Sequence, residues 1–186
     1  MSVEKNIAIA LEKLAQVQRV LLWDVAKEQK LSPIQIQFLI FIYNNTDKLC
    51  TVSCLADEFD LTKATVSDAI KNLEEKSYLL KKQSPADKRS SVLQLSKKGK
   101  ELFKKVQSWQ STIFDVISEF SETKQKQFSL LLNELIVKLY DKGIVSVARI
   151  CTTCDNLQLT SGRYLCNFTG KVFPKEKVTY GCENYY

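Results

Sequence analysis

The sequence predicts a mainly α-helical protein of the α+β class, with long helices at both ends, short helices between them and one β-hairpin. Apolar residues recur at alternating spacings of three and four along both terminal stretches, which is the pattern of helices with one buried face. Capping residues precede these stretches. Two short apolar runs flank the sequence PADKR, and this arrangement predicts the hairpin. With 186 residues and 45% hydrophobic content, the chain is long enough for a domain with its own core.

The first helix is expected over residues 3–28, and its apolar positions form a seam that another helix could cover. These positions are Ile7, Leu11, Leu14, Leu21 and Val25, with Gln18 in the same row. A second helix is expected from Pro33, because Ser32 is a predicted N-cap and Gln35 completes a capping box. The sequence NNTDK ends this helix.

Two short helices follow, separated by a tight turn at residues 60 and 61 and preceded by the capping residues Thr51 and Thr62. The second of them has a predicted buried stripe of Val66, Ile70 and Leu73. Its other side is short, polar and basic, and comprises Thr62, Lys63, Thr65, Ser67, Asp68 and Lys71. A helix, a short turn and a polar second helix over residues 51–76 predict a helix-turn-helix.

The next segment, residues 78–96, predicts a hairpin with strands at 78–84 and 90–96. Strand alternation places Leu93 and Leu95 on the core side and leaves the connecting tip in solvent. At the tip, Asp87 can accept hydrogen bonds from its own backbone and can orient Arg89. A basic hairpin directly after a helix-turn-helix is a wing, so the predicted fold class is a winged helix-turn-helix.

Ser96 is predicted to cap one helix that runs through Phe120, and a last long helix begins after Ser121 and ends at Gly143. Helical periodicity stops there, so we expect one domain over residues 1–142 and a cysteine-rich tail over residues 143–186. No apolar run is long enough to cross a membrane, and the N-terminus carries acidic residues and no cleavage signature. We therefore expect a cytoplasmic protein that does not associate with a membrane.

Positive charge is concentrated around the predicted wing. The whole chain has a net charge of +6, whereas residues 76–105 contain ten Lys or Arg against two acidic residues, a local excess of eight. Concentrated positive charge on one element favours a polyanionic partner. The alternative is a solvated basic face, which is the commoner origin of an isolated lysine run.

Residues 61–99 resemble the core of the multiple-antibiotic-resistance regulator (MarR) family, in which a helix-turn-helix is followed by a wing with a D-x-R turn and an LT-x-x-G helix start. Here these motifs are Asp87-Lys88-Arg89 and Leu95-Ser96-Lys97-Lys98-Gly99. Ser77 departs from the pattern, because the family usually has glycine at this helix end. The resemblance extends over about residues 5–142.

The resemblance implies a homodimer whose terminal helices interlock and which binds double-stranded DNA at a palindromic operator, most simply as a repressor. It implies a minor-groove contact for the wing-tip Arg89. The candidate contacts to base edges and nearby phosphates are Thr62, Lys63, Thr65, Ser67, Asp68 and Lys71. Lys81, Lys82 and Lys88 are expected to add backbone electrostatics, although lysines can also serve only to keep an edge strand soluble.

Family members often bind small aromatic effectors, so a small-molecule effector is a further candidate partner. Trp23, Phe38, Phe41 and Tyr43 could line such a cavity. Aromatic residues at helical spacing are more often part of the core, and we name no ligand.

The tail spaces its cysteines as C-x2-C-x11-C-x15-C, at Cys151, Cys154, Cys166 and Cys182. Two intervening residues let the first pair grip one ion, and the other two thiolates complete a tetrahedron without histidine. A structural zinc ion is therefore the expected cofactor, an iron–sulfur cluster is the alternative, and free or disulfide-switching thiols come third. Cys50 and Cys54 are expected to be small buried side chains outside this site.

The rival function is an enzyme, a thiol–disulfide oxidoreductase using Cys151 and Cys154, or a redox or iron–sulfur sensor. A protein-interaction adaptor that uses the tail is a third class and stays open. A catalytic C-x-x-C normally begins a helix beside a βαβ unit, and the sequence predicts no such unit. The chain also contains no histidine, which removes the usual general base. We therefore expect a DNA-binding regulator and not an enzyme.

Overall fold

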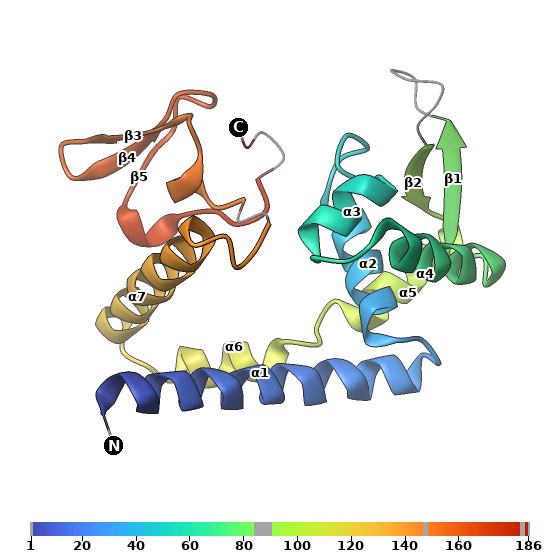
Figure 1. Ribbon diagram of the computed structural model, residues 1–186, viewed down its shortest axis with the longest axis horizontal. Helices are drawn as coiled ribbons and strands as arrows, with labels where there is room; N and C mark the ends of the chain where they lie inside the picture. The colour runs from blue at the N-terminus through green and yellow to red at the C-terminus, as the bar shows by residue number, and fades with distance from the viewer. Residues whose placement is uncertain (1, 84–90, 147–148, 183–184, 186) are drawn as a thin grey trace. The chain divides into compact units, whose positions relative to one another are not determined.

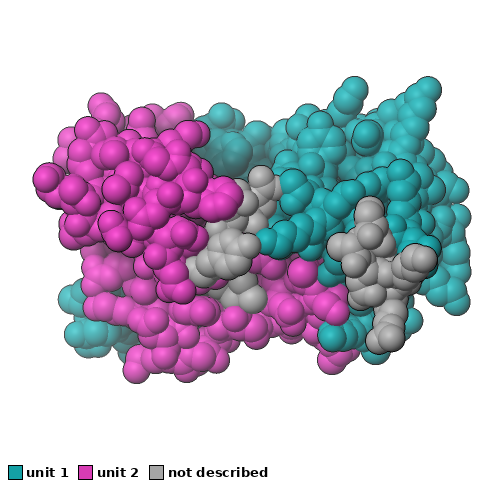
Figure 2. Space-filling model, turned by 90° about the horizontal axis from the view of Figure 1, so that it is seen from above, with its two compact units in different colours: residues 1–52, 63–115 teal, residues 53–62, 116–186 magenta. Residues whose placement is uncertain are grey.

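The computed structural model describes residues 2–83, 91–146, 149–182 and 185. The chain divides into two compact units, one formed by residues 1–52 and 63–115 and the other by residues 53–62 and 116–186 (Figure 2). We call them unit 1 and unit 2. Of the residues that the structure describes, none belongs to a helix long and apolar enough to cross a membrane.

The elements occur in nearly the predicted order (Figure 1). The helices are α1 (Val3–Glu28), α2 (Pro33–Asn44), α3 (Val52–Glu58), α4 (Lys63–Glu75), α5 (Lys97–Val106), α6 (Ser111–Ser118) and α7 (Glu122–Asp141). The strands are β1 (Leu79–Gln83), β2 (Ser91–Leu95), β3 (Leu157–Thr160), β4 (Arg163–Cys166) and β5 (Val172–Phe173). Two 3₁₀ turns, η1 (Cys151–Thr153) and η2 (Lys175–Lys177), complete the described part of the chain.

The core of unit 1 surrounds α2, which contacts α1, α4, α5 and β2. This helix is apolar on several sides, and Ile36, Phe38 and Leu39 are fully buried. The predicted capping box at its start is confirmed. The Gln35 backbone N–H donates to Ser32 Oγ over 3.4 Å, and the Ser32 N–H donates to Gln35 Oε1 over 3.0 Å.

The hairpin of unit 1 pairs β1 with β2 in antiparallel register, from Leu79 opposite Leu95 to Gln83 opposite Ser91. Leu93 and Leu95 are buried, as predicted, and Val92 is buried as well. A hydrogen bond of 2.7 Å from the Leu93 N–H to the Cys50 carbonyl fixes β2 at its centre.

Four residues, Ser77, Tyr78, Ser96 and Gly99, join the end of α4, both strands and the start of α5; we call them the hairpin junction. The Tyr78 carbonyl accepts from the Ser96 N–H over 3.0 Å. The Ser96 hydroxyl donates to the Ser77 carbonyl over 2.7 Å and accepts from the Gly99 N–H over 3.0 Å. A Cβ on Gly99 would lie 2.1 Å from the Tyr78 oxygen, so only glycine fits there.

The prediction of one helix from Ser96 to Phe120 is wrong, because the structure has two helices, α5 and α6, with a break at residues 107–110. In the break the Trp109 N–H bonds to the Val106 carbonyl and the Ser111 N–H bonds to the Ser108 carbonyl. These bonds span three residues where an α-helix would span four, so the turn is tighter and the α-helix is interrupted. Serines at 108 and 111 favour such local alternatives to the helix.

Unit 2 contains α3, α7 and the three-stranded antiparallel sheet β3-β4-β5. The predicted cap of the last helix is confirmed, since Ser121 Oγ accepts from the Lys124 N–H over 3.4 Å. The helix ends at Gly143, which adopts a φ of +69°. From residue 149 onward the described residues contain only two buried side chains, Arg149 and Ile150. The predicted boundary at residue 142 rests on composition and stays a prediction.

Three helices end with the same arrangement, and in each the left-handed position that favours glycine is held by another residue. These residues are Lys30 after α1, Asp60 after α3 and Ser77 after α4, with φ values of 53°, 48° and 61°. After α4, the Ser77 N–H bonds to the Glu74 carbonyl and the Tyr78 N–H to the Leu73 carbonyl, both over 2.8 Å. Ser77, which stands where the MarR pattern has glycine, therefore keeps the hydrogen bonds of the helix end. It does so in a left-handed conformation that costs a serine free energy.

We expect Ser77→Gly to raise the free energy of unfolding by about 0.5–1 kcal/mol, because glycine adopts the left-handed conformation without a steric penalty. Urea denaturation at one fixed protein concentration measures the change. Ser77→Ala is the matched control and should bring no gain, since alanine has the same Cβ as serine. A loss of stability in Ser77→Gly would contradict the account.

Candidate nucleic-acid interface and cysteine cluster

The polar side of α4 is exposed over its first two turns. Val66, Ile70 and Leu73 are fully buried, as predicted. The predicted contact residues Thr62, Lys63, Thr65, Ser67, Asp68 and Lys71 are all exposed. The helix therefore presents hydroxyl, ammonium and carboxylate groups on one side and its apolar stripe on the other.

α4 is held in place by a polar contact from α2. Gln35, which is buried, donates through Nε2 to Asn72 Oδ1 over 2.9 Å and to the Ala69 carbonyl over 3.4 Å. The same side chain closes the capping box of α2. One amide group thus links the start of α2 to the second half of α4. These contacts do not use the exposed polar side chains of α4.

The two wing lysines lie on opposite faces of the hairpin. Lys81 is opposite Leu93 and Lys82 is opposite Val92 in the antiparallel register, and directly opposed residues share a face. Lys81 Nζ makes an ion pair of 3.1 Å with Glu74 of α4, so part of its charge is already compensated. Lys82 is exposed on the other face. The remaining predicted wing residues, Asp87, Lys88 and Arg89, lie outside the described residues.

The predicted effector residues have different environments. Phe38 and Phe41 are buried and Trp23 is more than half exposed. Tyr43 stacks on Phe103 with ring centroids 3.6 Å apart. Tyr43 also lines a cavity of about 320 Å³, together with Ile42, Asp47, Leu93, Gln94, Leu95 and Lys100.

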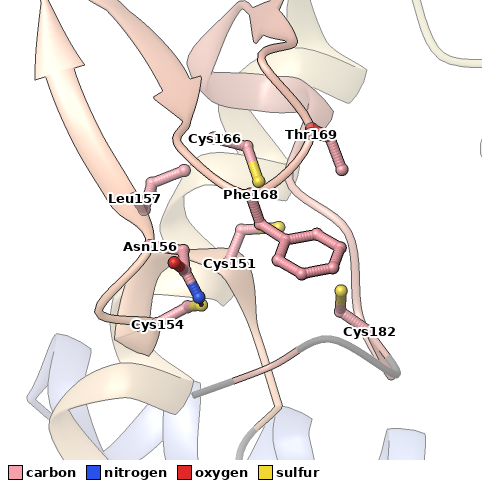
Figure 3. Close-up of a pocket in the computed structure, with 8 residues that line it drawn as sticks. All are labelled: Cys151, Cys154, Asn156, Leu157, Cys166, Phe168, Thr169 and Cys182. Atoms are coloured by element: carbon pink, nitrogen blue, oxygen red, sulfur yellow. Dashed lines mark hydrogen bonds between the residues drawn. The ribbon is translucent and has the colours of Figure 1, made fainter.

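The four tail cysteines line one small cavity in unit 2, of about 30 Å³ (Figure 3). Asn156, Leu157, Phe168 and Thr169 complete its lining. Cys151 opens η1 and Cys154 follows it, whereas Cys166 ends β4 and Cys182 lies in the final segment. Four thiols from separate points of the chain therefore face a common space. These four cysteines are free thiols.

Backbone hydrogen bonds bring these cysteines together. Leu157 pairs with Cys166 in the β3–β4 ladder, and the Leu157 N–H bonds to the Cys154 carbonyl, so Cys154 and Cys166 are neighbours. The Cys151 N–H bonds to the Thr179 carbonyl over 3.1 Å, which brings the final segment and Cys182 beside Cys151.

Hydrogen-bond donors surround two of the sulfur atoms. The Thr169 hydroxyl, with backbone N–H groups of Thr169 and Phe168, lowers the pKa of the Cys166 thiol. Asn156 Nδ2 lies 3.9 Å from Cys154 Sγ. Donors aimed at sulfur stabilise the thiolate. Gly170, with a φ of +68°, closes this turn through its N–H bond to the Cys166 carbonyl.

The four cysteines line the cavity, but their sulfur atoms are not arranged in the coordination geometry of a metal site. Within the described ranges, no three or more His, Cys, Asp or Glu side chains form a ready-made metal site. The lining of the cavity does not include Cys50 or Cys54. Cys50 is buried, and its Sγ lies 3.6 Å from the Ile42 and Asn45 carbonyls. Cys151 begins a 3₁₀ turn of three residues, so it lacks the α-helix N-terminus that typically activates a redox thiol.

Residues 149–182, which we call the cysteine module, are anchored to the helices of unit 2 by polar contacts. Asn133 of α7 is buried, and its Oδ1 lies 3.4 Å from Thr152 Oγ1 and 3.5 Å from the Tyr180 hydroxyl. Lys126 of α7 lies 4.0 Å from Glu176 of η2. The module is therefore packed along α7 by contacts from both of its ends.

A second anchor joins the start of the module to α3. Arg149 Nη1 lies 3.3 Å from Glu58 Oε2, an ion pair in which the arginine side chain is about nine-tenths buried. Burial raises the pKa of Glu58, Arg149 opposes that rise, and Asp60 adds to it. Just before the module, Ser146 donates to Asp60 Oδ1 through its hydroxyl and through its N–H, the latter over 3.1 Å.

Sequence patterns missed several of these residues. Nothing in local spacing pairs Arg149 with Glu58 or points to a buried Asn133, because each partner lies far along the chain. For Thr169 and Gly170 the sequence did offer a signal, since the turn-forming sequence NFTG directly follows the predicted ligand Cys166. The break between α5 and α6 had one as well, in the serines that flank Trp109.

Comparisons with known proteins agree with this architecture. A family model described as MarR family matches residues 29–90. The HTH-type transcriptional regulator BilQ of Clostridioides difficile (strain CD3) is 30% identical over 105 residues, which are 54% of this chain and 68% of that protein.

Two solved structures show the same fold. A MarR/EmrR family transcriptional regulator from Acinetobacter sp. ADP1 has a TM-score of 0.62 at 22% identity, and the match covers 76% of this chain and 99% of that one. The S. aureus MepR–DNA complex has a TM-score of 0.59 at 20% identity, and the match covers 71% of this chain and 97% of that one.

Proposed function

This chain belongs to the MarR family of winged-helix transcriptional regulators, and on that premise we propose that it binds double-stranded DNA as a homodimer and represses transcription from a pseudo-palindromic operator. The observation that carries the proposal is the exposed polar side of α4, held beside a basic hairpin in one compact unit. The solved MepR complex with DNA, which has the same fold, supports it.

α4 has the composition of a helix that enters a major groove. Lys63 and the hydroxyls of Thr65 and Ser67 suit phosphate oxygens and purine acceptors, and Asp68 suits the amino group of cytosine. The hairpin junction supports a fixed orientation of the wing on α4, because it ties the Ser77 and Tyr78 carbonyls to the start of α5. Lys82, Lys88 and Arg89 supply positive charge along the hairpin for the backbone and the adjacent minor groove.

The dimer is supported by apolar side chains that each unit leaves exposed. On α1 these are Val3, Ile7, Ile9, Leu14, Val17, Val20 and Trp23. On α6, on α7 and beyond, they include Phe114, Val116, Phe120, Leu130, Leu131, Leu139 and Ile144. Monomers rarely leave so many large apolar residues exposed on their helices, so a second copy is the proposed cover. A two-fold dimer presents two α4 helices, which matches a pseudo-palindromic site.

As a DNA-binding repressor, the protein is proposed to work in the cytoplasm and to have no catalytic role. Repression follows most simply from a dimer that covers its operator. The cavity beside Tyr43 is the place to look for a small-molecule effector. Selection of bound fragments from genomic DNA would identify the operator, and a reporter under its control gives the sign of regulation.

We expect Arg89→Ala to weaken binding to all operator variants by about 1–3 kcal/mol, because one minor-groove insertion per subunit is lost. Lys63→Ala should weaken binding and lower the slope of log affinity against log salt by about 1 per subunit, since it removes one phosphate contact. Fluorescence anisotropy over a salt series measures both. Arg163→Ala, an exposed arginine of β4, is the matched control. Unchanged affinity at fixed salt for both variants would contradict the interface.

We expect Leu131→Glu to raise the dimer dissociation constant at least about tenfold, because two-fold symmetry buries an unpaired carboxylate twice. Leu131 is 66% exposed on α7 in the single chain. Sedimentation velocity over a concentration series measures the constant. Leu159→Glu, at a β3 residue that is 59% exposed, is the control and should leave the dimer unchanged. A parent protein that is monomeric at micromolar concentration would sink the proposal.

A further inference from the structure

We propose that Cys151, Cys154, Cys166 and Cys182 bind a single metal ion of the zinc class, which stabilises the cysteine module in place of a hydrophobic core. The four thiols face one small cavity (Figure 3). Thiolates are soft metal ligands, and the sequence contains no histidine that could replace any of these four. Four thiolates favour zinc or iron among the common metals and disfavour magnesium or calcium.

The module needs such an ion because its apolar burial is small. Three strands of four, four and two residues form its sheet, and Leu159, Phe168 and Val172 are all more than half exposed. In the described part of the module, Ile150 is the one buried apolar side chain. A segment of this size cannot fold on so little buried area, and a structural metal supplies the missing free energy.

The backbone already holds the ligands as two neighbouring pairs. The β3–β4 ladder brings Cys154 beside Cys166, and the bond from the Cys151 N–H to the Thr179 carbonyl brings the chain end beside Cys151. Rotation of the four side chains toward the cavity that they line is the adjustment that the proposed site requires. On binding, each thiol transfers its proton to solvent and forms one metal–sulfur bond, so a divalent ion and four thiols give a site of charge −2 and four protons.

The surroundings suit one ion better than a cluster. The cavity of about 30 Å³ has room for a single small species such as one ion or one water molecule. Phe168 also lines the cavity, and its ring is drawn between Cys151 and Cys182 in Figure 3. The N–H groups of Phe168 and Thr169, with the Thr169 hydroxyl, hydrogen-bond to the Cys166 sulfur, and Asn156 lies beside Cys154. Outer donors of this kind orient metal ligands and disperse their charge.

The test uses the full-length chain, purified in a reducing, oxygen-free buffer and without a polyhistidine tag, so that no added ligand competes. Elemental analysis should find one zinc per chain. Cys166→Ser should lower zinc affinity more than about tenfold, whereas Cys54→Ser, a cysteine outside the cavity, should keep full occupancy. Exchange with Co²⁺ should give the intense sulfur-to-cobalt absorption of a tetrathiolate site. Chelation should open Arg163 and Lys171 to trypsin while unit 1 stays intact.

Two results would overturn the proposal. One is protein without metal in which all four tail thiols react freely with a thiol reagent. The other is zinc retained equally by the parent and Cys166→Ser, which marks adventitious binding. Iron with acid-labile sulfide would overturn the single ion in favour of a cluster.

A second inference comes from the anchor on α3 and rests on the proposed DNA-binding function. We infer that the tail tunes operator affinity through the ion pair of Arg149 with Glu58 and the bond of Ser146 to Asp60. Glu58 is the last residue of α3, and Asp60 is the left-handed residue of the turn that leads into α4. Contacts that fix the conformation of this turn also restrain the residues that directly precede the proposed recognition helix.

Arg149→Met tests this coupling, because it keeps the bulk of the side chain and removes the charge. Operator affinity should fall about fivefold or more, while the dimer stays as in the parent; zinc content measured in parallel reports whether the module itself is still folded. Ser146→Ala should shift affinity in the same direction by less, because its N–H bond to Asp60 remains. Arg163→Ala is the control. Equal affinity of Arg149→Met and parent would refute the coupling, whereas a parent that binds no DNA would refute the proposed function itself.

Discussion

The carbonyl of Tyr78 is the point on which the winged lobe depends. It accepts the N–H of Ser96, and the α5 backbone approaches it so closely that Gly99 can carry no side chain. This single approach sets where β2 ends, where α5 begins and how the hairpin leaves α4. The motif L-S-x-x-G therefore has a physical content. Serine caps α5 and bonds back to Ser77, and glycine leaves room for the carbonyl.

The two compact units are stabilised by different means. Unit 1 has an apolar centre around α2, with Ile36, Phe38 and Leu39 removed from water. The cysteine module of unit 2 relies on polar anchors, among them Asn133 and the ion pair of Arg149 with Glu58. Breaking such a buried pair leaves one charge uncompensated. Substitutions at these few anchor positions should therefore destabilise the module, whereas substitutions at its exposed positions should have little effect.

Local sequence signals predicted the elements that local chemistry determines. Ser32, Gln35 and Ser121 act as caps at the expected positions because capping involves residues three apart. The cysteine spacing named the four residues that line one cavity, and the metal ion expected there stays a prediction. The break at residues 107–110 was missed because apolar periodicity continues across it. The contacts of Asn133 and Arg149 could not be predicted from the sequence, since they depend on how distant segments of the chain pack together.

Unit 2 is discontinuous in sequence, and this has a consequence for synthesis. Asp60 and Ser146 are 86 residues apart, and closing a flexible loop of that length costs about 4 kcal/mol in chain entropy. Residues 63–115 reduce this cost if they are already compact, which makes unit 1 the natural first product on the ribosome. α3 leaves the ribosome long before Ser146 and Arg149 do. It therefore acquires these partners only after Ser146 and Arg149 have been synthesised.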